Sequence, residues 1–269
     1  MNYNVVAAIG LSIFAGLATG IGGLILLLFK KVNIKLLSVA LGFSAGVMIY
    51  VSFVEILPEA KNFLTNAYGG TKGDWVTFIA FFAGVFLIGI IDKLVPDADN
   101  PHELQSMEQL DVCGLGQNSQ KLIKTGKMAA LAITIHNFPE GLATFVSGMN
   151  DISLGIAIAI AVAIHNIPEG ISVALPIYCA TGNKKEAFFK SLISGLAEPV
   201  GAIVAFLFLG PFLNDVMFGL IYASIAGIMV YISFDELLPS AREYGEHHLS
   251  IYGLVGGMIV MGISLLLLG

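Results

Sequence analysis

The sequence predicts an all-α integral membrane protein that crosses the bilayer eight times. Of its 269 residues, 57% are hydrophobic and 12% are charged, and the mean hydropathy is +0.87. This composition leaves too little polar surface to cover a soluble globule. The apolar residues fall into eight stretches, and each stretch is long enough as a helix to cross a hydrocarbon core of about 30 Å.

The predicted spans lie, in chain order, at Val5–Phe29, Leu36–Leu57, Trp75–Val95, Met128–Met149, Ile152–Tyr178, Ala187–Leu209, Val216–Leu238 and Ile251–Leu268. We expect the first span to remain in the protein, because the leading MNYN lacks the positive charge of a signal peptide and the apolar run is too long for one. Glycines in the first two spans, as in AGLATGIGG and GFSAG, are small enough to let helix backbones approach closely.

The distribution of basic residues predicts the orientation of the chain. The connections after odd-numbered spans hold eleven Lys and Arg residues, whereas those after even-numbered spans hold only two, Lys61 and Lys72. The positive-inside rule therefore places the odd-numbered connections in the cytoplasm and both termini outside, in an inner or plasma membrane. The one long connection, residues 96–127, is polar and rich in turn-forming residues, so we expect a flexible cytoplasmic loop there.

An internal repeat predicts symmetry within the bundle. MIYVSFVEILPEA, from Met48, and MVYISFDELLPSA, from Met229, agree at eight of thirteen positions and end the second and seventh spans. These spans cross the membrane in opposite directions, which is typical of inverted-topology repeats. We therefore predict a 3+2+3 arrangement, in which the first three and the last three spans form inverted units around a central pair.

The central pair carries a second repeat, HNFPEG in the fourth span and HNIPEG in the fifth. In each copy a histidine and a glutamate are four residues apart and project from one helix face: His136 with Glu140, and His165 with Glu169. An asparagine follows each histidine. Such groups are costly inside a membrane and indicate a functional site.

Asn137, Asn166 and Glu198 add polar groups at the same depth. At 1.5 Å per residue, all seven polar residues lie about 12–26 Å into their spans, near the bilayer midplane. Three unpaired, ionised glutamates would cost about 8–10 kcal/mol there, and a bound divalent cation can offset that cost. Hydrogen bonding between helices or a proton relay is the alternative, but so many ligand types at one depth favour a metal. Imidazole, carboxylate and amide groups suit Zn²⁺ or another borderline first-row ion.

The residues resemble those of the ZIP (Zrt/Irt-like) family of divalent metal transporters, especially its ZupT-like zinc-uptake branch. The resemblance covers nearly the whole chain and rests on HNFPEG, HNIPEG and GLAEPVG. It implies a binuclear site with one metal held by His136, Glu140, His165 and Glu169. It implies a second metal held by Asn137, Asn166 and Glu198, with Glu140 and Glu169 bridging both ions.

Three further acidic residues are expected on the path of the ion. The resemblance implies acidic groups at the cytoplasmic end of the seventh span, which correspond to Asp235 and Glu236. Glu55, the counterpart of Glu236 in the repeat, lies at the outer end of the second span, where it either gathers cations or sits where an unpaired carboxylate costs least. The case for Glu59 is weaker, because its counterpart is Ser240.

Together these features predict a single transmembrane transporter domain over residues 1–269, which takes up divalent metal ions by alternating access. Zn²⁺ is the chief expected substrate, with Fe²⁺, Mn²⁺, Co²⁺ and Cd²⁺ as further candidates, and no organic cofactor is expected. An intramembrane metal-dependent hydrolase is the alternative, but the HExxH motif of zinc proteases is absent. The expected partners are metal ions and the lipid bilayer rather than nucleic acid, and the oligomeric state is left open, a homodimer included.

Overall fold

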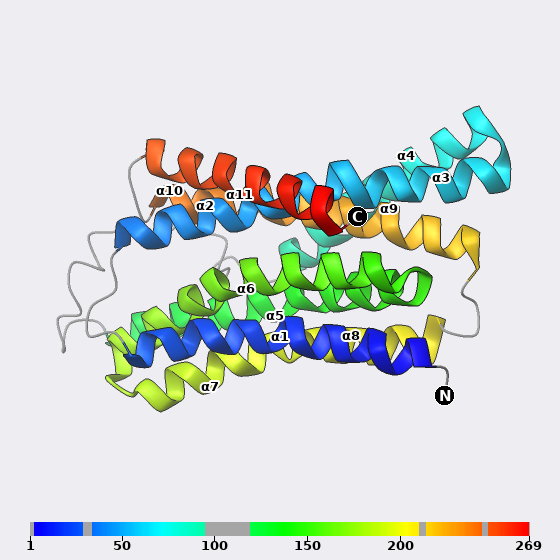
Figure 1. Cartoon of the computed structure of the whole chain (residues 1–269). Coiled ribbons are helices and arrows are strands. Elements are labelled where there is room, and N and C mark those ends of the chain that lie inside the picture. The colour runs from blue at the N-terminus through cyan, green and yellow to red at the C-terminus, as the bar shows by residue number, and fades with distance from the viewer. Residues whose placement is uncertain (1–2, 29–33, 95–118, 210–213, 244–246, 269) are drawn as a thin grey trace.

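The computed structural model describes residues 3–28, 34–94, 119–209, 214–243 and 247–268. Every element within these ranges is helical, and no strand occurs among them. The long helices run side by side along one direction of the molecule (Figure 1). An all-α protein is therefore confirmed.

In the described ranges, eight helical segments correspond to the eight predicted spans. They are α1 (Tyr3–Leu28); α2 (Ile34–Val51), η1 (Ser52–Ile56) and α3 (Leu57–Tyr68); α4 (Gly70–Leu94); α5 (Ser119–Asn150); α6 (Ile152–Thr181); α7 (Lys184–Gly195), α8 (Ala197–Val204) and η4 (Ala205–Leu209); α9 (Asp215–Ile232), η6 (Ser233–Leu237) and α10 (Leu238–Glu243); and α11 (His247–Leu268). Seven of these segments, all but α5, are long and apolar enough to cross a membrane. The fourth predicted span lies within α5 and is helical throughout.

Two helices continue past the ends predicted from the sequence. The second and seventh spans are predicted to end at Leu57 and Leu238, but they extend into α3 and α10. In each case a π-helical turn precedes a proline: the Leu57 N–H donates to the carbonyl of Ser52, and the Leu238 N–H donates to that of Ser233. A wider turn makes room for the proline ring, which would clash with the preceding carbonyl in a regular α-helix.

The helices form two layers (Figure 1). One layer contains α1, α5, α6, α7 and α8, with α6 packed between α1 and α5. The other contains α2, α3, α4, α9, α10 and α11, in which α2 packs on α11 and α4 packs on α9. The predicted three-helix units therefore interleave, because the first span of each unit lies in one layer and its other two spans lie in the second.

Matching close contacts occur in the two halves of the second layer. Gly46 of α2 lies so close to the carbonyl oxygen of Leu254 of α11 that a Cβ atom there would clash. A Cβ atom at Gly227 of α9 would clash in the same way with the carbonyl oxygen of Phe81 of α4. Each glycine precedes its copy of the thirteen-residue repeat by two positions. Small residues at equivalent positions thus let both pairs of backbones approach closely.

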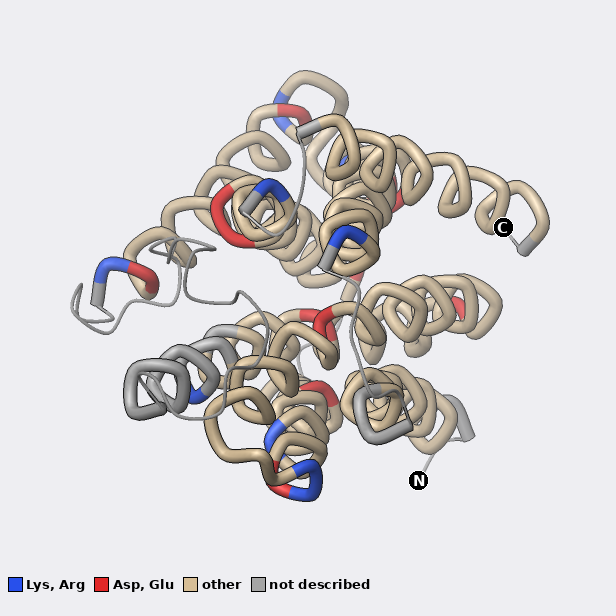
Figure 2. Tube along the Cα trace, turned by 90° about the vertical axis from the view of Figure 1, so that its left-hand side faces the viewer, with Lys and Arg blue, Asp and Glu red and all other residues tan. Residues whose placement is uncertain are grey.

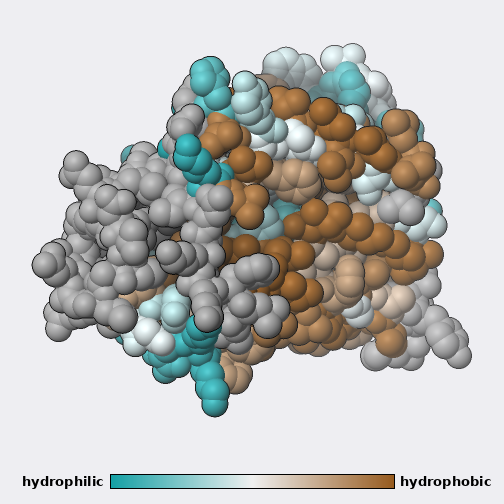
Figure 3. Space-filling model, turned by 60° about the vertical axis from the view of Figure 1, so that its left-hand side comes forward, coloured by the Kyte–Doolittle hydropathy of each residue, from teal (hydrophilic) through white to brown (hydrophobic). Residues whose placement is uncertain are grey.

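Charge and hydropathy are distributed as expected for a membrane protein. Within the described ranges, most Lys and Arg residues gather at the end of the bundle that faces the viewer in Figure 2. On the face drawn in Figure 3, hydrophobic side chains cover the sides of the helices and hydrophilic ones gather towards its margins.

The predicted loop at residues 96–127 is only partly within the described residues. Residues 95–118 lie outside them, so flexibility there stays a prediction. Residues 119–127 are helical and form the start of α5. The helix thus begins well before the predicted apolar span, which starts at Met128.

Candidate metal centre

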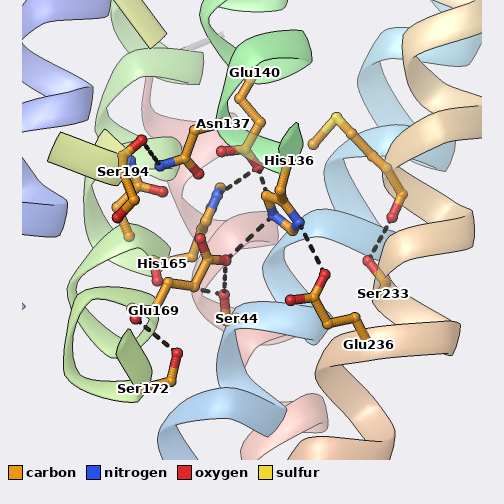
Figure 4. Close-up of polar contacts among 12 residues, drawn as sticks. Ser44, His136, Asn137, Glu140, His165, Glu169, Ser172, Ser194, Ser233 and Glu236 are labelled. Atoms are coloured by element: carbon orange, nitrogen blue, oxygen red, sulfur yellow. Dashed lines mark hydrogen bonds and ion pairs between the residues drawn. The ribbon is translucent and has the colours of Figure 1, made fainter. Parts of the chain in front are cut away.

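The two hexapeptides bring four side chains together in the middle of the bundle. His136 and Glu140 project from α5, and His165 and Glu169 project from α6 (Figure 4). The Nε2 atom of His165 lies 2.9 Å from Oε1 of Glu140. The Nε2 atom of His136 lies 3.4 Å from Oε1 of Glu140 and 3.5 Å from Oε1 of Glu169. All four side chains are buried, and their role as metal ligands stays a prediction.

The geometry of this group suits a metal ion. One ligand atom each from His136, Glu140 and Glu169 can be chosen so that all lie within 4.8 Å of one another. Within the described part of the chain, Oε2 of Glu140, Oε2 of Glu169 and Nδ1 of His165 have no hydrogen-bond partner. Each unmet buried polar group costs about 1–3 kcal/mol. A divalent cation would satisfy such acceptors together.

Asn137, Asn166 and Glu198 form a neighbouring group. The Nδ2 atom of Asn166 donates to Oε1 of Glu198 and to the carbonyl of Ala15 on α1 at 3.0 Å. The Nδ2 atom of Asn137 donates to the carbonyl of Ser194 on α7 at 3.1 Å. Both amide oxygens and Oε2 of Glu198 are left without a hydrogen-bond partner among the described residues. This group therefore also presents unmet oxygen acceptors.

Glu198 reaches this place because the sixth span, predicted as one helix, is interrupted beside it. The helix α7 ends at Gly195, and Leu196 forms a turn before α8 begins. Glu198 lies in the first turn of α8. Pro199 follows it, and a proline is tolerated in the first turn because the N–H groups there have no helical partner.

Glycines in the motifs hold the surrounding helices close. A Cβ atom at Gly141, the last residue of HNFPEG, would clash with the backbone of Glu198 on α8. A Cβ atom at Gly170, the last residue of HNIPEG, would clash with the carbonyl oxygen of Thr19 on α1. The hexapeptide thus combines two candidate ligands with the glycine that allows the next helix to approach.

Two side chains from the other layer complete the surroundings. The hydroxyl of Ser44 on α2 donates to Oε1 of Glu169 at 3.0 Å. The same hydroxyl oxygen lies 3.3 Å from the carbonyl oxygen of His165. Oε2 of Glu236 on η6 lies 3.8 Å from Nδ1 of His136 (Figure 4). Ser44 was not expected at this site, because its motif GFSAG indicates only close helix packing.

The other two acidic residues expected on the path are Glu55 and Asp235. Glu55 on η1 lies near Glu59 and near Tyr222 of α9. Asp235 on η6 lies near Tyr231. A role for Glu55 or Asp235 in conduction therefore stays a prediction.

Comparison with known proteins identifies the family. The model of the family described as ZIP Zinc transporter matches residues 97–265. Over 268 residues the chain is 61% identical to the zinc transporter ZupT of Lysinibacillus sphaericus, covering 100% of both chains. It is 58% identical to the ZupT of Oceanobacillus iheyensis, covering 98% of this chain and 99% of the relative, and 55% identical to that of Streptococcus mutans, covering 99% of each. The chain therefore belongs to the ZIP zinc transporter family.

Proposed function

We propose that this protein imports Zn²⁺ through a binuclear metal centre in the middle of the membrane. Its family and its relatives make it a multi-pass transporter of divalent metal rather than an enzyme, which removes the hydrolase alternative. The observation that carries the proposal is the buried group of histidine and glutamate ligand atoms, several of which lack a hydrogen-bond partner among the described residues.

The centre binds two ions. The first ion is held by His136, Glu140, His165 and Glu169, and the second is held by Asn137, Asn166 and Glu198 with Glu140 and Glu169 bridging. Unmet acceptor atoms in both groups support this division. Fe²⁺, Mn²⁺, Co²⁺ and Cd²⁺ are further substrates, because nitrogen and oxygen ligands accept several borderline ions. No organic cofactor takes part.

Transport proceeds by alternating access. Alternating access needs an outward-facing and an inward-facing conformation. Inverted three-helix units around α5 and α6 would supply both. Three observations support the inverted symmetry: the sequence repeat, the π-helical turns at equivalent positions of it, and the matching contacts of Gly46 and Gly227. The ligands are buried in the present arrangement, as an occluded or one-sided centre requires.

The ion moves from the end with few basic residues to the end with many. The positive-inside rule places the basic end in the cytoplasm of an inner or plasma membrane and both termini outside. Glu55 then lies on the outer part of the path, and Asp235 and Glu236 lie on the inner part. The approach of Glu236 to His136 supports an inner path that begins at the centre.

Uptake of radiolabelled zinc into sealed vesicles that contain the purified protein tests this function. The wild-type protein should move zinc across the bilayer, and Glu140→Gln should not. Asp74→Asn is a matched control, because Asp74 forms an exposed salt bridge with Lys61 at 3.0 Å. Exposed salt bridges contribute little to the stability of a protein. A wild-type protein that binds zinc without moving it would contradict transport, and one that binds none would contradict the centre.

A further inference from the structure

A row of hydroxyl groups extends the ligand-bearing face of α5 beyond the metal centre. Glu140, Thr144 and Ser147 are four and three residues apart, so they share one helix face. Both hydroxyl groups are buried, and neither has a hydrogen-bond partner among the described residues. A helical hydroxyl often bonds to the carbonyl of the preceding turn, as Thr134 does with Ala130 at 2.6 Å. The hydroxyl groups of Thr144 and Ser147 form no such hydrogen bond.

A third hydroxyl group faces this row from the other layer. Tyr222 of α9 is 1% exposed, and its Oη atom has no hydrogen-bond partner within the described ranges. The side chains of Ser147 and Asn150 lie at the range of a weak hydrogen bond from it, and neither forms a well-aligned one. Its ring packs beside those of Phe63 and Phe218, with ring centroids 6.2 and 6.4 Å away. A buried tyrosine hydroxyl usually finds a partner, so this one is unusual.

Two carboxylates lie at the far end of the row. Glu55 and Glu59 are four residues apart, one on η1 and the other on α3, and lie close enough to repel each other. Both carboxylates also lie near the hydroxyl of Tyr222. Each is partly exposed. This pair of negative charges can attract a hydrated cation to the outer end of the row.

The row spans the interval between the membrane surface and the centre. Glu140 and Ser147 are seven residues apart on α5, which corresponds to about 10 Å along the helix axis, and the helix ends about 15 Å from Glu140. Half of a hydrocarbon core is also about 15 Å. The three hydroxyl groups therefore occupy the depth that an ion must cross to reach the centre from that side.

Well-formed hydrogen bonds between helices do not account for these hydroxyl groups among the described residues. Hydroxyls that join helices here have clear partners: Ser12 bonds to the carbonyl of Gly141 at 3.2 Å, and Ser191 bonds to that of Thr19 at 2.7 Å. Polar atoms that are buried without such partners suit water or the hydration shell of an ion.

We propose that Thr144, Ser147 and Tyr222 line the hydrated route by which a divalent cation gathered at Glu55 and Glu59 reaches the metal centre. The inference rests on the proposed transport function. Neutral hydroxyl oxygens can replace part of the water shell of an ion without holding it as a carboxylate would. All three side chains are buried in this structure, so the route is closed here and opens when the centre faces outward.

Cysteine labelling tests whether the row becomes hydrated. In a cysteine-free background that still takes up zinc, Thr144→Cys and Ser147→Cys should react with a membrane-impermeant thiol reagent added from outside. Val146→Cys is the matched control, because Val146 is equally buried but its position is turned away from this face. Failure of both row positions to react, or equal reaction at Val146→Cys, would overturn the route.

Uptake measurements test whether the ion uses the row. Thr144→Val, Ser147→Ala and Tyr222→Phe each remove only a hydroxyl group, and each should lower the initial rate of zinc uptake about fivefold. The amount of zinc bound at equilibrium should not change, because the ligands of the centre remain. Thr134→Val and Ser224→Ala are controls on the same helices, since their hydroxyl groups bond to carbonyls outside the row.

The outcomes separate this inference from the proposed function. If the wild-type protein moves no zinc, the proposed function fails and the inference fails with it. If the wild-type protein transports zinc and all three hydroxyl variants match the controls, the route is wrong while the proposed function stands. If the hydroxyl variants bind less zinc at equilibrium, the row belongs to the centre and the route is again wrong.

Discussion

The Nε2 atom of His165 on α6 lies 2.9 Å from the Oε1 atom of Glu140 on α5. The two residues come from different copies of the hexapeptide, so the copies meet at one place. A single pair at positions i and i+4 supplies only two protein ligands, and a tetrahedral zinc ion held without water needs four. Two copies of the motif, one on each of two packed helices, would together supply the four ligands of the proposed site.

Removing a ligand from this group should abolish uptake. We expect His136→Ala and Glu140→Ala each to lower the rate of zinc uptake by at least about a hundredfold. Both variants should still insert, because each makes its helix more apolar. Uptake into vesicles is measured against the amount of protein in the membrane. Wild-type rates in both variants would show that these residues are not ligands.

The hydrogen bond from Ser44 should hold Glu169 in position for metal binding. We expect Ser44→Ala to weaken zinc binding about tenfold, because the groups that orient a ligand contribute about this much to affinity. Competition with a chelator of known affinity measures the change. Ser38→Ala is the control on the same helix, since Ser38 bonds instead to the carbonyl of Ala241 at 2.6 Å. Equal zinc affinities in the Ser44→Ala and Ser38→Ala variants would contradict a role for Ser44 in positioning Glu169.

The close approach of α5 and α8 at Gly141 should be sensitive to a single methyl group. We expect Gly141→Ala to lower the free energy of unfolding by about 1–3 kcal/mol, because the new Cβ atom would overlap the backbone of Glu198. Gly10→Ala is the control in α1, where a Cβ atom would meet nothing within 4 Å. Thermal unfolding of the purified protein compares them. A Gly141→Ala variant as stable as the control would mean that the helices can separate at little cost.

The two ends of the bundle should be accessible from opposite sides of the membrane. In a cysteine-free variant, single cysteines at residues 96–118 should react with impermeant thiol reagents only from the cytoplasmic side. Gly70→Cys should react only from outside, because it lies at the turn between α3 and α4, and the connections on that side hold only two basic residues. Labelling of both positions from the same side would contradict the proposed topology.

Composition and spacing predicted the membrane class, the helices and the residues that meet at the centre, because helical periodicity decides which side chains share a face. The π-helical turns before Pro58 and Pro239 were not predictable in this way, since a proline after an apolar run usually ends a helix. Ser44 could not be distinguished from a serine that only packs. The approach of Glu236 to His136 depends on how the two layers pack, which no local pattern encodes.

Glu198 should separate the two metal positions, because four other side chains can already hold the first ion. Three glutamates leave a net charge of −1 with one divalent ion and +1 with two, so the second ion binds more weakly. We expect Glu198→Gln to keep one tightly bound Zn²⁺ per chain, to weaken or lose the second, and to slow transport. The amide oxygen of glutamine can still accept the hydrogen bond from Asn166, so the fold around it should persist. Calorimetry that finds two full-strength ions in this variant, or none, would contradict the assignment of Glu198 to the second position.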